Sequence, residues 1–340
     1  MKVIIVGAGL SGLSTAIALR KYLSQPLEIK IYDKTDPHDG SSDESDRRLK
    51  NQGAAISLQS NGLRVLRELD PALGERVYSA GYPCKHFTWK TASDFLLGHD
   101  YQDILPISRP ILIQCLQDSL PTDFVSYKTV SRVVIREGKS PIVQFEDGSP
   151  DETADLVIGA DGIRSPVRHS LFGDDSKYRP EYLGICAVGG VLDMALPEDY
   201  IKDPSITFIM GSTGVFGYCV PDRNLKLDHE LITKQLCGRH KDWTDPLINK
   251  CLQNAELGNI YPIFIVPDVP FWGKNGVVLV GDAAHAMPPK TGQGSSQAFE
   301  DAQTLSLLLA EHLSGPRFNN PAINRDDIVA QAVERSVKGL

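Results

Sequence analysis

The sequence predicts an α/β protein in which segments from both ends of the chain form a parallel-sheet domain and the middle forms an antiparallel β-sheet domain. Apolar runs of the kind that is buried on both faces of a parallel sheet occupy residues 2–6, 155–160 and 276–280. Between residues 184 and 221, strand-like runs alternate with turn residues and little helix. We therefore expect residues 1–71, 107–170 and 276–340 to build the first domain, and residues 72–106 and 171–275 the second.

The composition is that of a globular enzyme-sized protein. The chain has 340 residues, 41% of them hydrophobic, with 35 Lys and Arg against 43 Asp and Glu, which gives a net charge of −8. This acidic balance lacks the basic footprint of a nucleic-acid-binding protein, and no apolar stretch reaches the roughly 18 residues of a membrane span. The six cysteines are scattered without a C-x-x-C pair or zinc spacing, which favours reduced thiols, no metal site and a cytoplasmic protein.

The first element is a strand–helix–strand unit over residues 2–33. A glycine-rich turn, Gly7-Ala-Gly9-Leu10-Ser11-Gly12, lies between its strand and its helix. The three glycines would allow a tight turn, close approach of a pyrophosphate and close helix–strand packing. Asp33 ends the second strand, 21 residues beyond Gly12, where a carboxylate can bind a ribose. Together these features predict a Rossmann-like domain that binds a dinucleotide.

The remaining elements follow in chain order. A polar, charge-dense loop is expected at residues 35–50, helices at 61–69 and 106–120, and β-hairpin material at 124–145. Strands are expected at 155–160, 184–192, 206–210, 215–220 and 276–280, and helices at 231–257 and 297–313, with a further helix beginning near residue 331. The α/β character at both ends is the reason to expect one discontinuous domain.

Two further segments carry a family resemblance. Residues 155–168, DLVIGADGIRSPVR, resemble the "DG" fingerprint of flavin-dependent hydroxylases, and residues 281–302, beginning GDAAHAMPPKTGQG, resemble their "GD" fingerprint. With the N-terminal glycine motif, in the same order and spacing, the chain resembles class A flavoprotein monooxygenases of the p-hydroxybenzoate and salicylate hydroxylase type. The resemblance spans nearly the whole chain, with smaller matches at residues 53–66 and 108–112.

The resemblance implies FAD as the cofactor and assigns residues to it. In the family, the acid of the GD segment, here Asp282, binds a ribityl or ribose hydroxyl, and the helix that follows points its N–H groups at the N1–C2=O edge of the flavin. The implied FAD-binding residues are Gly7, Gly9, Leu10, Ser11, Gly12, Asp33, Lys34, Arg47 or Arg48, Gly53, Ala54, Arg109, Asp161, Asp282, Pro288, Gly292, Gln293, Gly294 and Ser295. His285 is expected to pack and hydrogen-bond locally.

The implied activity is hydroxylation or epoxidation of an aromatic or other electron-rich small molecule. NAD(P)H would reduce FAD as a transient co-substrate, and O₂ would give a flavin C4a-hydroperoxide that delivers oxygen. Arg164 and Arg168 are either surface charges or neighbours of the NAD(P)H approach. Tyr218 and His86 are hypothetical bases for a phenol substrate. The alternatives are a flavin oxidase or halogenase of the same superfamily, or a degenerate FAD-binding protein.

The length bears on the second domain. Family members usually run longer, and the shortfall is expected after Pro221 and at the C-terminus. A trimmed substrate domain would mean a more open pocket, a partner that completes it, or a truncated product. The sequence leaves the substrate, the choice between NADH and NADPH, and the oligomeric state open.

Overall fold

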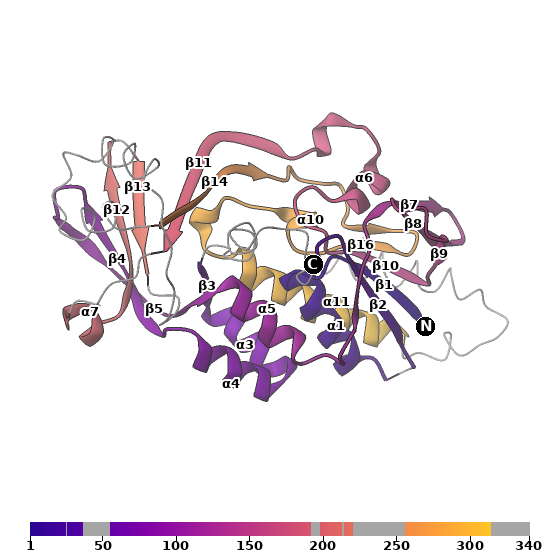
Figure 1. Cartoon of the computed structure of the whole chain (residues 1–340), viewed down its shortest axis with the longest axis horizontal. Coiled ribbons are helices and arrows are strands. Elements are labelled where there is room, and N and C mark those ends of the chain that lie inside the picture. The colour runs from indigo at the N-terminus through magenta and orange to yellow at the C-terminus, as the bar shows by residue number, and fades with distance from the viewer. Residues whose placement is uncertain (25, 37–54, 192–197, 213, 220–255, 314–340) are drawn as a thin grey trace.

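A six-stranded, largely parallel sheet forms the centre of the first domain in the computed structural model, which describes residues 1–24, 26–36, 55–191, 198–212, 214–219 and 256–313 (Figure 1). Its strand order is β15 (Gly273–Lys274), β16 (Val277–Leu279), β10 (Leu156–Gly159), β1 (Lys2–Val6), β2 (Glu28–Asp33) and β6 (Val125–Tyr127). The pairs from β16 to β6 are parallel, and only β15 runs antiparallel to its neighbour. Four segments that are distant in sequence therefore meet in one sheet.

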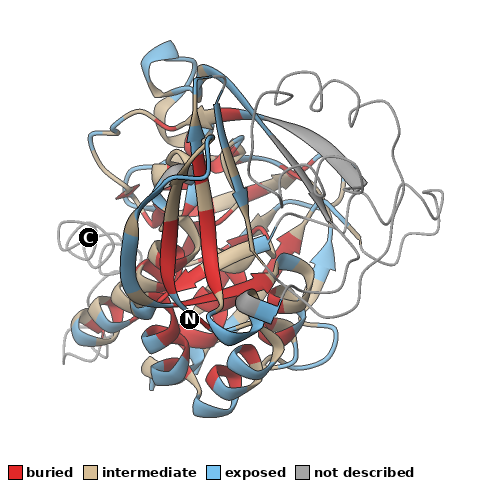
Figure 2. Ribbon diagram, turned by 90° about the vertical axis from the view of Figure 1, so that its left-hand side faces the viewer, coloured by how far each residue is buried: buried red, intermediate tan, exposed pale blue. Residues whose placement is uncertain are grey.

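Both faces of this sheet are covered, because successive residues of β1 point to opposite sides. Val3 and Ile5 pack with helices α1 (Leu10–Tyr22), α3 (Ser60–Leu69), α4 (Pro71–Ala80), α5 (Arg109–Gln117) and α11 (Gly294–Leu313). Ile4 and Val6 pack with β7 (Val130–Arg136), β8 (Lys139–Phe145) and α6 (Pro166–Phe172). Figure 2 shows the buried residues concentrated in the central strands and the inner sides of the helices. This double burial explains the unbroken apolar runs of the sequence.

A small antiparallel sheet of β7, β8 and β9 (Glu152–Thr153) is tied to the parallel sheet by charge. Glu152 Oε2 lies 2.7 Å from Lys2 Nζ and 2.9 Å from Lys30 Nζ. The Tyr32 hydroxyl donates a hydrogen bond to the same carboxylate. The two cations and the hydroxyl, which come from β1 and β2, fix this sheet at one place on the parallel sheet.

A separate five-stranded sheet has the order β13 (Gly214–Tyr218), β12 (Ser205–Gly211), β4 (Cys84–Thr91), β5 (Leu96–Ser108) and β3 (Ala55–Gln59), so that residues 55–59, expected in the first domain, pair with strands of the expected second one. Two long strands, β11 (Glu181–Val191) and β14 (Glu256–Ile265), pair antiparallel and run between the two regions (Figure 1). The short elements α7 (Glu198–Lys202), α10 (Asp282–His285) and the 3₁₀ turns Ser176–Tyr178 and Pro289–Thr291 complete the described chain. None of its described helices is long and apolar enough to cross a membrane.

The predicted fold class is confirmed, with two corrections to its details. The five-stranded sheet is mixed, because β12 pairs with β4 in parallel while its other pairs are antiparallel. Residues 125–127 leave the expected hairpin and join the parallel sheet beside β2, since the hairpin proper begins at Val130. The expected loop at 35–50, apart from its first two residues, the helix at 231–257, apart from its last two, and the helix near 331 lie outside the described residues. Glu256 and Leu257 belong to β14.

Candidate FAD site

The three glycine- and acid-containing segments meet at one edge of the parallel sheet. β16, β10, β1 and β2 are neighbours, and their carboxyl ends lead into Gly281-Asp282, Asp161, Gly7 and Asp33, respectively. Ligands of parallel α/β sheets bind outside the carboxyl ends of the strands. The sheet order thus places residues 7, 33, 161 and 282 side by side along the carboxyl edge of the parallel sheet.

The glycine turn fits this edge without space for side chains. Gly7 has φ of +106°, and a Cβ on it would lie 2.3 Å from the carbonyl oxygen of Ala160. A Cβ on Gly12 would lie 1.9 Å from the carbonyl oxygen of Gly7. Gly9 differs, because nothing lies within 4 Å of the position of its Cβ. Gly7 and Gly12 therefore serve close packing, and Gly9 leaves room for a ligand before the first turn of α1.

Asp33 holds the turn in place. Its Oδ2 accepts a hydrogen bond of 2.7 Å from the Ala8 N–H, and its Oδ1 accepts one of 2.8 Å from the Thr35 N–H. Asp33 is half-buried, whereas its neighbour Lys34 is exposed. The carboxylate is thus oriented by the backbone at the point where a ribose would lie, and the Lys34 side chain extends into solvent.

Asp282 presents a carboxylate at the same edge. It is the first residue of α10 and is exposed, yet the surrounding protein raises the pKa of its carboxyl by desolvation, against the opposing charges of His285 and Arg109. Gly281, just before it, abuts Ser11, since a Cβ at Gly281 would lie 2.0 Å from the Ser11 hydroxyl oxygen.

Asp161 and Arg168 form the buried support of the DG segment. The Val167 N–H donates to Asp161 Oδ2 at 3.1 Å, and burial raises the pKa of Asp161 to about 6 despite this hydrogen bond and the nearby Arg168. Arg168 is 4% exposed and donates to the carbonyl oxygens of Ala283, at 2.8 Å, and Ile163. Arg168 is therefore no surface charge: it joins the DG and GD segments. Arg164, in contrast, is exposed.

The GD segment ends in a loop that helix α11 follows. Gly292 adopts the left-handed conformation, with φ of +62°, and α11 begins at Gly294, where nothing lies within 4 Å of the Cβ position. Pro288 precedes a 3₁₀ turn, and Ser295 is half-buried in the first turn of α11. The positive end of the helix dipole and its free N–H groups thus face an open approach.

Gln59 connects this loop with the five-stranded sheet, and sequence reasoning missed it. The Gln59 Oε1 accepts a hydrogen bond from Gln293 Nε2, and Gln59 Nε2 donates to the carbonyl oxygen of Thr291 at 3.5 Å. Its backbone N–H donates to the Ser296 hydroxyl at 3.2 Å. Because these contacts span more than 230 residues, no local pattern indicates them.

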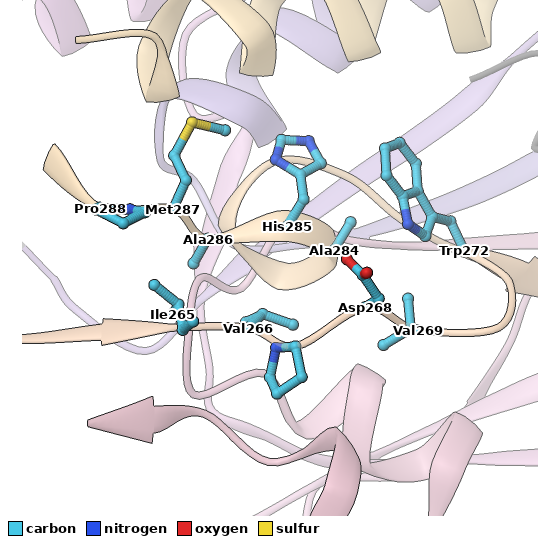
Figure 3. Close-up of a pocket in the computed structure, with 11 residues that line it drawn as sticks. Ile265, Val266, Asp268, Val269, Trp272, Ala284, His285, Ala286, Met287 and Pro288 are labelled. Atoms are coloured by element: carbon cyan, nitrogen blue, oxygen red, sulfur yellow. The ribbon is translucent and has the colours of Figure 1, made fainter. Parts of the chain in front are cut away.

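A cavity of about 350 Å³ lies on the side of α10 (Figure 3). Its wall includes Trp272, His285, Met287 and Pro288, and the rings of Trp272 and His285 are 5.0 Å apart. A second cavity of the same size lies beside α6 and is lined by the arginines at 164, 168 and 179 and by the aromatic rings of Phe172 and Tyr178. Both cavities combine apolar and charged side chains: the first also includes Asp268, and the second includes Asp175 beside its arginines.

The predicted site residues divide into three groups. Gly7, Gly9, Leu10, Ser11, Gly12, Asp33, Asp161, Asp282, Pro288, Gly292, Gln293, Gly294 and Ser295 lie along this edge of the sheet or on the loop joined to Gln59. Arg109, at the start of α5, is close enough to Asp282 for its charge to oppose the rise in the pKa of that carboxyl. Arg47, Arg48, Gly53 and Ala54 lie outside the described residues.

His86 and Tyr218 are not part of this edge. His86 is 2% exposed on β4, with its ring 4.7 Å from that of His99 and its Nε2 3.7 Å from Asp203 Oδ2. Tyr218 pairs with Thr207, and Thr207 with Thr88, so these residues share a face with His86. Their role as bases stays a hypothesis. It requires that the substrate contact the face of the five-stranded sheet on which His86 and Tyr218 lie.

The residues present fit FAD. Room at Gly9 and Gly294, an oriented carboxylate at Asp33 and an accessible one at Asp282 match a ligand with a pyrophosphate, sugar hydroxyls and a flat ring. An FAD-binding domain family matches residues 270–322, and an NAD(P)-binding Rossmann-like domain family matches residues 5–69. The fold and the site thus define a flavoprotein with a Rossmann-like nucleotide domain.

Comparison with known proteins narrows this class. The chain is 28% identical to zeaxanthin epoxidase of Nicotiana plumbaginifolia, and the match covers 92% of this chain and 49% of that enzyme. The chain therefore spans about half the length of this relative. It is 25% identical to salicylate hydroxylase of Pseudomonas putida, covering 92% of this chain and 77% of that enzyme. Klebsiella pneumoniae HpxO, solved with FAD and uric acid, shares the fold with a TM-score of 0.74 at 22% identity, covering 99% of this chain and 84% of that one. The chain is thus similar over nearly its whole length to FAD-dependent hydroxylases and an epoxidase, in agreement with the family resemblance of its three motifs.

Proposed function

We propose that the protein takes electrons from NAD(P)H and uses O₂ to hydroxylate or epoxidise an aromatic or other electron-rich small molecule. The observation that carries this proposal is the convergence of Gly9, Asp33, Asp282 and the N-terminus of α11 on one edge of the sheet. FAD bound there would supply the redox chemistry and the activation of oxygen. The relatives are hydroxylases and an epoxidase, so a flavin oxidase or halogenase is not favoured.

The residues of the chain have four tasks in this reaction. Asp33 and Asp282 would hold the sugar hydroxyls, and the N–H groups at the start of α11 would stabilise negative charge at the adjacent ring edge. Arg168 keeps the DG and GD segments in register. Gln59 fixes the loop before α11 to the five-stranded sheet, so that ring and substrate wall keep one geometry.

The cavity beside α6 is the candidate site for the phosphates of NAD(P)H. It offers the exposed Arg164, and Arg179 paired with Asp174, together with the rings of Phe172 and Tyr178, a combination that suits phosphate groups and a nucleotide base. The chain presents one glycine fingerprint of the dinucleotide type, so a second nucleotide would bind without a fold of its own. The choice between NADH and NADPH is part of the test below.

The test uses the purified protein. We expect it to retain FAD, to oxidise NADH or NADPH faster when an electron-rich arene is present, and to incorporate one atom of ¹⁸O₂ into the product, measured by mass spectrometry. A protein that takes up no FAD would contradict the cofactor assignment, and FAD reduction without labelled product would contradict the monooxygenase activity.

Free thiols at Cys84 and Cys115 support the cytoplasm as the compartment, which cell fractionation would check.

A further inference from the structure

One face of the five-stranded sheet carries a continuous aromatic and aliphatic surface. The rings of Trp89 and Phe208 stack with centroids 4.9 Å apart, and the Phe87 ring lies 5.8 Å from that of Phe208. Phe87, Ile104 and Ile206 form one cluster, and Trp89 and Phe208 pack against it. We call this set, Phe87, Trp89, Ile104, Ile206 and Phe208, the aromatic face.

The aromatic face is the face that continues into the flavin loop. Ile104 belongs to its cluster, and the residue opposite Ile104 in the antiparallel pair β3–β5 is Gln59. Residues opposite one another in such a pair project from the same side of the sheet. Gln59 bonds to Gln293 and to the Thr291 carbonyl, directly before α11. The apolar cluster and the loop that would hold the flavin ring are therefore joined on one side.

The opposite face carries buried polar side chains around the two residues that the sequence suggested as bases, and the apolar pair Ile209 and Phe216 further along. His86, Thr88, Ser205 and Thr207 are each no more than 6% exposed there, and Thr88 Oγ1 lies 3.3 Å from His99 Nδ1. Tyr218 stands opposite Thr207 and shares this side. Because side chains alternate along a strand, His86 and Tyr218 point away from the aromatic face.

The charges of the aromatic side determine what it can bind. Along β4, β12, β13 and the paired part of β5, the described residues of this side include two charged ones, Lys85 and Asp100, and both are exposed. Their charges are opposite, and Asp100 stands opposite Phe87. A substrate carboxylate would meet mainly aromatic rings here, because the exposed charges of Lys85 and Asp100 offset each other and the described residues of this side include no arginine. An uncharged apolar substrate leaves no charge without a partner when it moves from water to this face.

The face is also long. Ile206, Phe208 and Met210 follow each other on the same side of β12, which is about 13 Å at roughly 3.3 Å per residue. Burial falls along this line, from Ile206 at 4% exposed to Met210 at 42%, and Val215 opposite Met210 is 59% exposed. Exposed apolar surface that continues from a buried cluster is typical of an interaction surface. Its length exceeds that of a single benzene ring.

We infer that the substrate is an uncharged, extended apolar molecule that lies along the aromatic face, with its electron-rich ring or double bond between Phe208 and the Gln59–Gln293 contact. This inference rests on the proposed function and adds the substrate class to it. Trp89 and Phe208 are then specificity-determining residues, because their stacked rings provide a flat wall for the substrate. His86 and Tyr218 have no contact with the substrate.

The test compares matched ligands on the FAD-loaded protein. Equilibrium dialysis would measure the dissociation constants of 4-hydroxybiphenyl and of its carboxylated analogue, 4′-hydroxybiphenyl-4-carboxylate. We expect the neutral ligand to bind at least tenfold more tightly. Phe208→Leu and Trp89→Leu should weaken its binding by three- to tenfold, whereas Tyr218→Phe and Thr88→Val, on the opposite face of the sheet, should change it less than twofold.

The outcomes separate this inference from the proposed function. The inference would be overturned if the carboxylated ligand bound as tightly as the neutral one or more tightly. It would also be overturned if Tyr218→Phe weakened binding of the neutral ligand and Phe208→Leu did not. Dialysis reads binding without turnover, so tight binding of the neutral ligand in a protein that forms no ¹⁸O-labelled product would contradict the proposed function alone. Circular dichroism and FAD content of each variant establish that the fold is intact.

Discussion

His285 Nε2 lies 2.7 Å from Asp301 Oδ2, and the same oxygen accepts the Gly281 N–H at 2.7 Å. One carboxylate of helix α11 thus holds both ends of α10, the turn that carries Asp282. Asp301 lies in the second turn of α11 and is 6% exposed. Its function is to fix the GD turn on the helix behind it.

Asp301→Asn should destabilise the protein and remove one pH dependence. Burial lowers the pKa of His285, but the hydrogen bond and charge of Asp301 outweigh it, and the net pKa is raised. The stabilisation is therefore complete below the unfolded value of about 6.5 and is lost as pH rises through the raised pKa. We expect Asp301→Asn to lower the free energy of unfolding, measured in urea, by roughly 1–3 kcal/mol at pH 6. Above neutral pH, the stability of the variant should decline less with rising pH than that of the wild type. Glu311→Gln, exposed on the same helix, should leave both unchanged.

Glu152→Gln should release the small β7–β9 sheet from the parallel sheet. Burial raises the pKa of Glu152, but hydrogen bonds from Lys2, Tyr32 and Lys30 outweigh it and bring the pKa to about 2. The stabilisation is present above the unfolded pKa, about 4.3, and is lost as pH falls through that value towards 2. Because the site lies near solvent, we expect about 1 kcal/mol in urea unfolding at pH 7. An equal effect of Glu146→Gln, an exposed residue of the hairpin, would contradict this account.

Gly9 and Gly7 should respond differently to a side chain. Gly9 has φ of −77° and open space at its Cβ position, so Gly9→Val should keep the stability of the apoprotein within about 1 kcal/mol while weakening FAD binding at least tenfold. Gly7→Ala should unfold the protein or cost several kcal/mol, because its Cβ would meet the Ala160 carbonyl oxygen at a positive φ. Thermal unfolding and FAD titration measure the two effects. Normal FAD affinity in Gly9→Val would place the cofactor elsewhere.

The sequence predicted the elements whose signals are local. The βαβ unit, the strand before Gly281 and helix α11 are defined by apolar runs and turn glycines within a few residues, and all are present. Pairings between distant segments left no such signal: the parallel pair β4–β12 and the Gln59–Gln293 contact join residues more than 100 positions apart. For the same reason, alternation within β4 or within β13 could not show that His86 and Tyr218 share a face, or which face meets the flavin loop.

Arg168→Met should show that the DG segment depends on a buried cation. Arg168 donates to the Ala283 and Ile163 carbonyl oxygens and opposes the rise in the pKa of Asp161, which burial brings to about 6. A raised carboxyl pKa favours folding below the unfolded value, about 3.9, and this contribution is lost as pH rises through about 6. Without Arg168 the pKa of Asp161 should rise further, which moves the loss of stability to higher pH.

We expect Arg168→Met to lower the free energy of unfolding by about 3–5 kcal/mol at pH 7, because it leaves the buried Ala283 carbonyl, the Ile163 carbonyl and the Asp161 carboxylate without their cation. Asp161→Asn in the same background should recover part of this loss, since the two residues interact and their effects do not add. Arg164→Met, four positions away and exposed, is the matched control and should stay within about 0.5 kcal/mol of the wild type. A pH profile of urea unfolding for the three variants measures these effects, and an unchanged profile in Arg168→Met would show that Asp161 does not sense this charge.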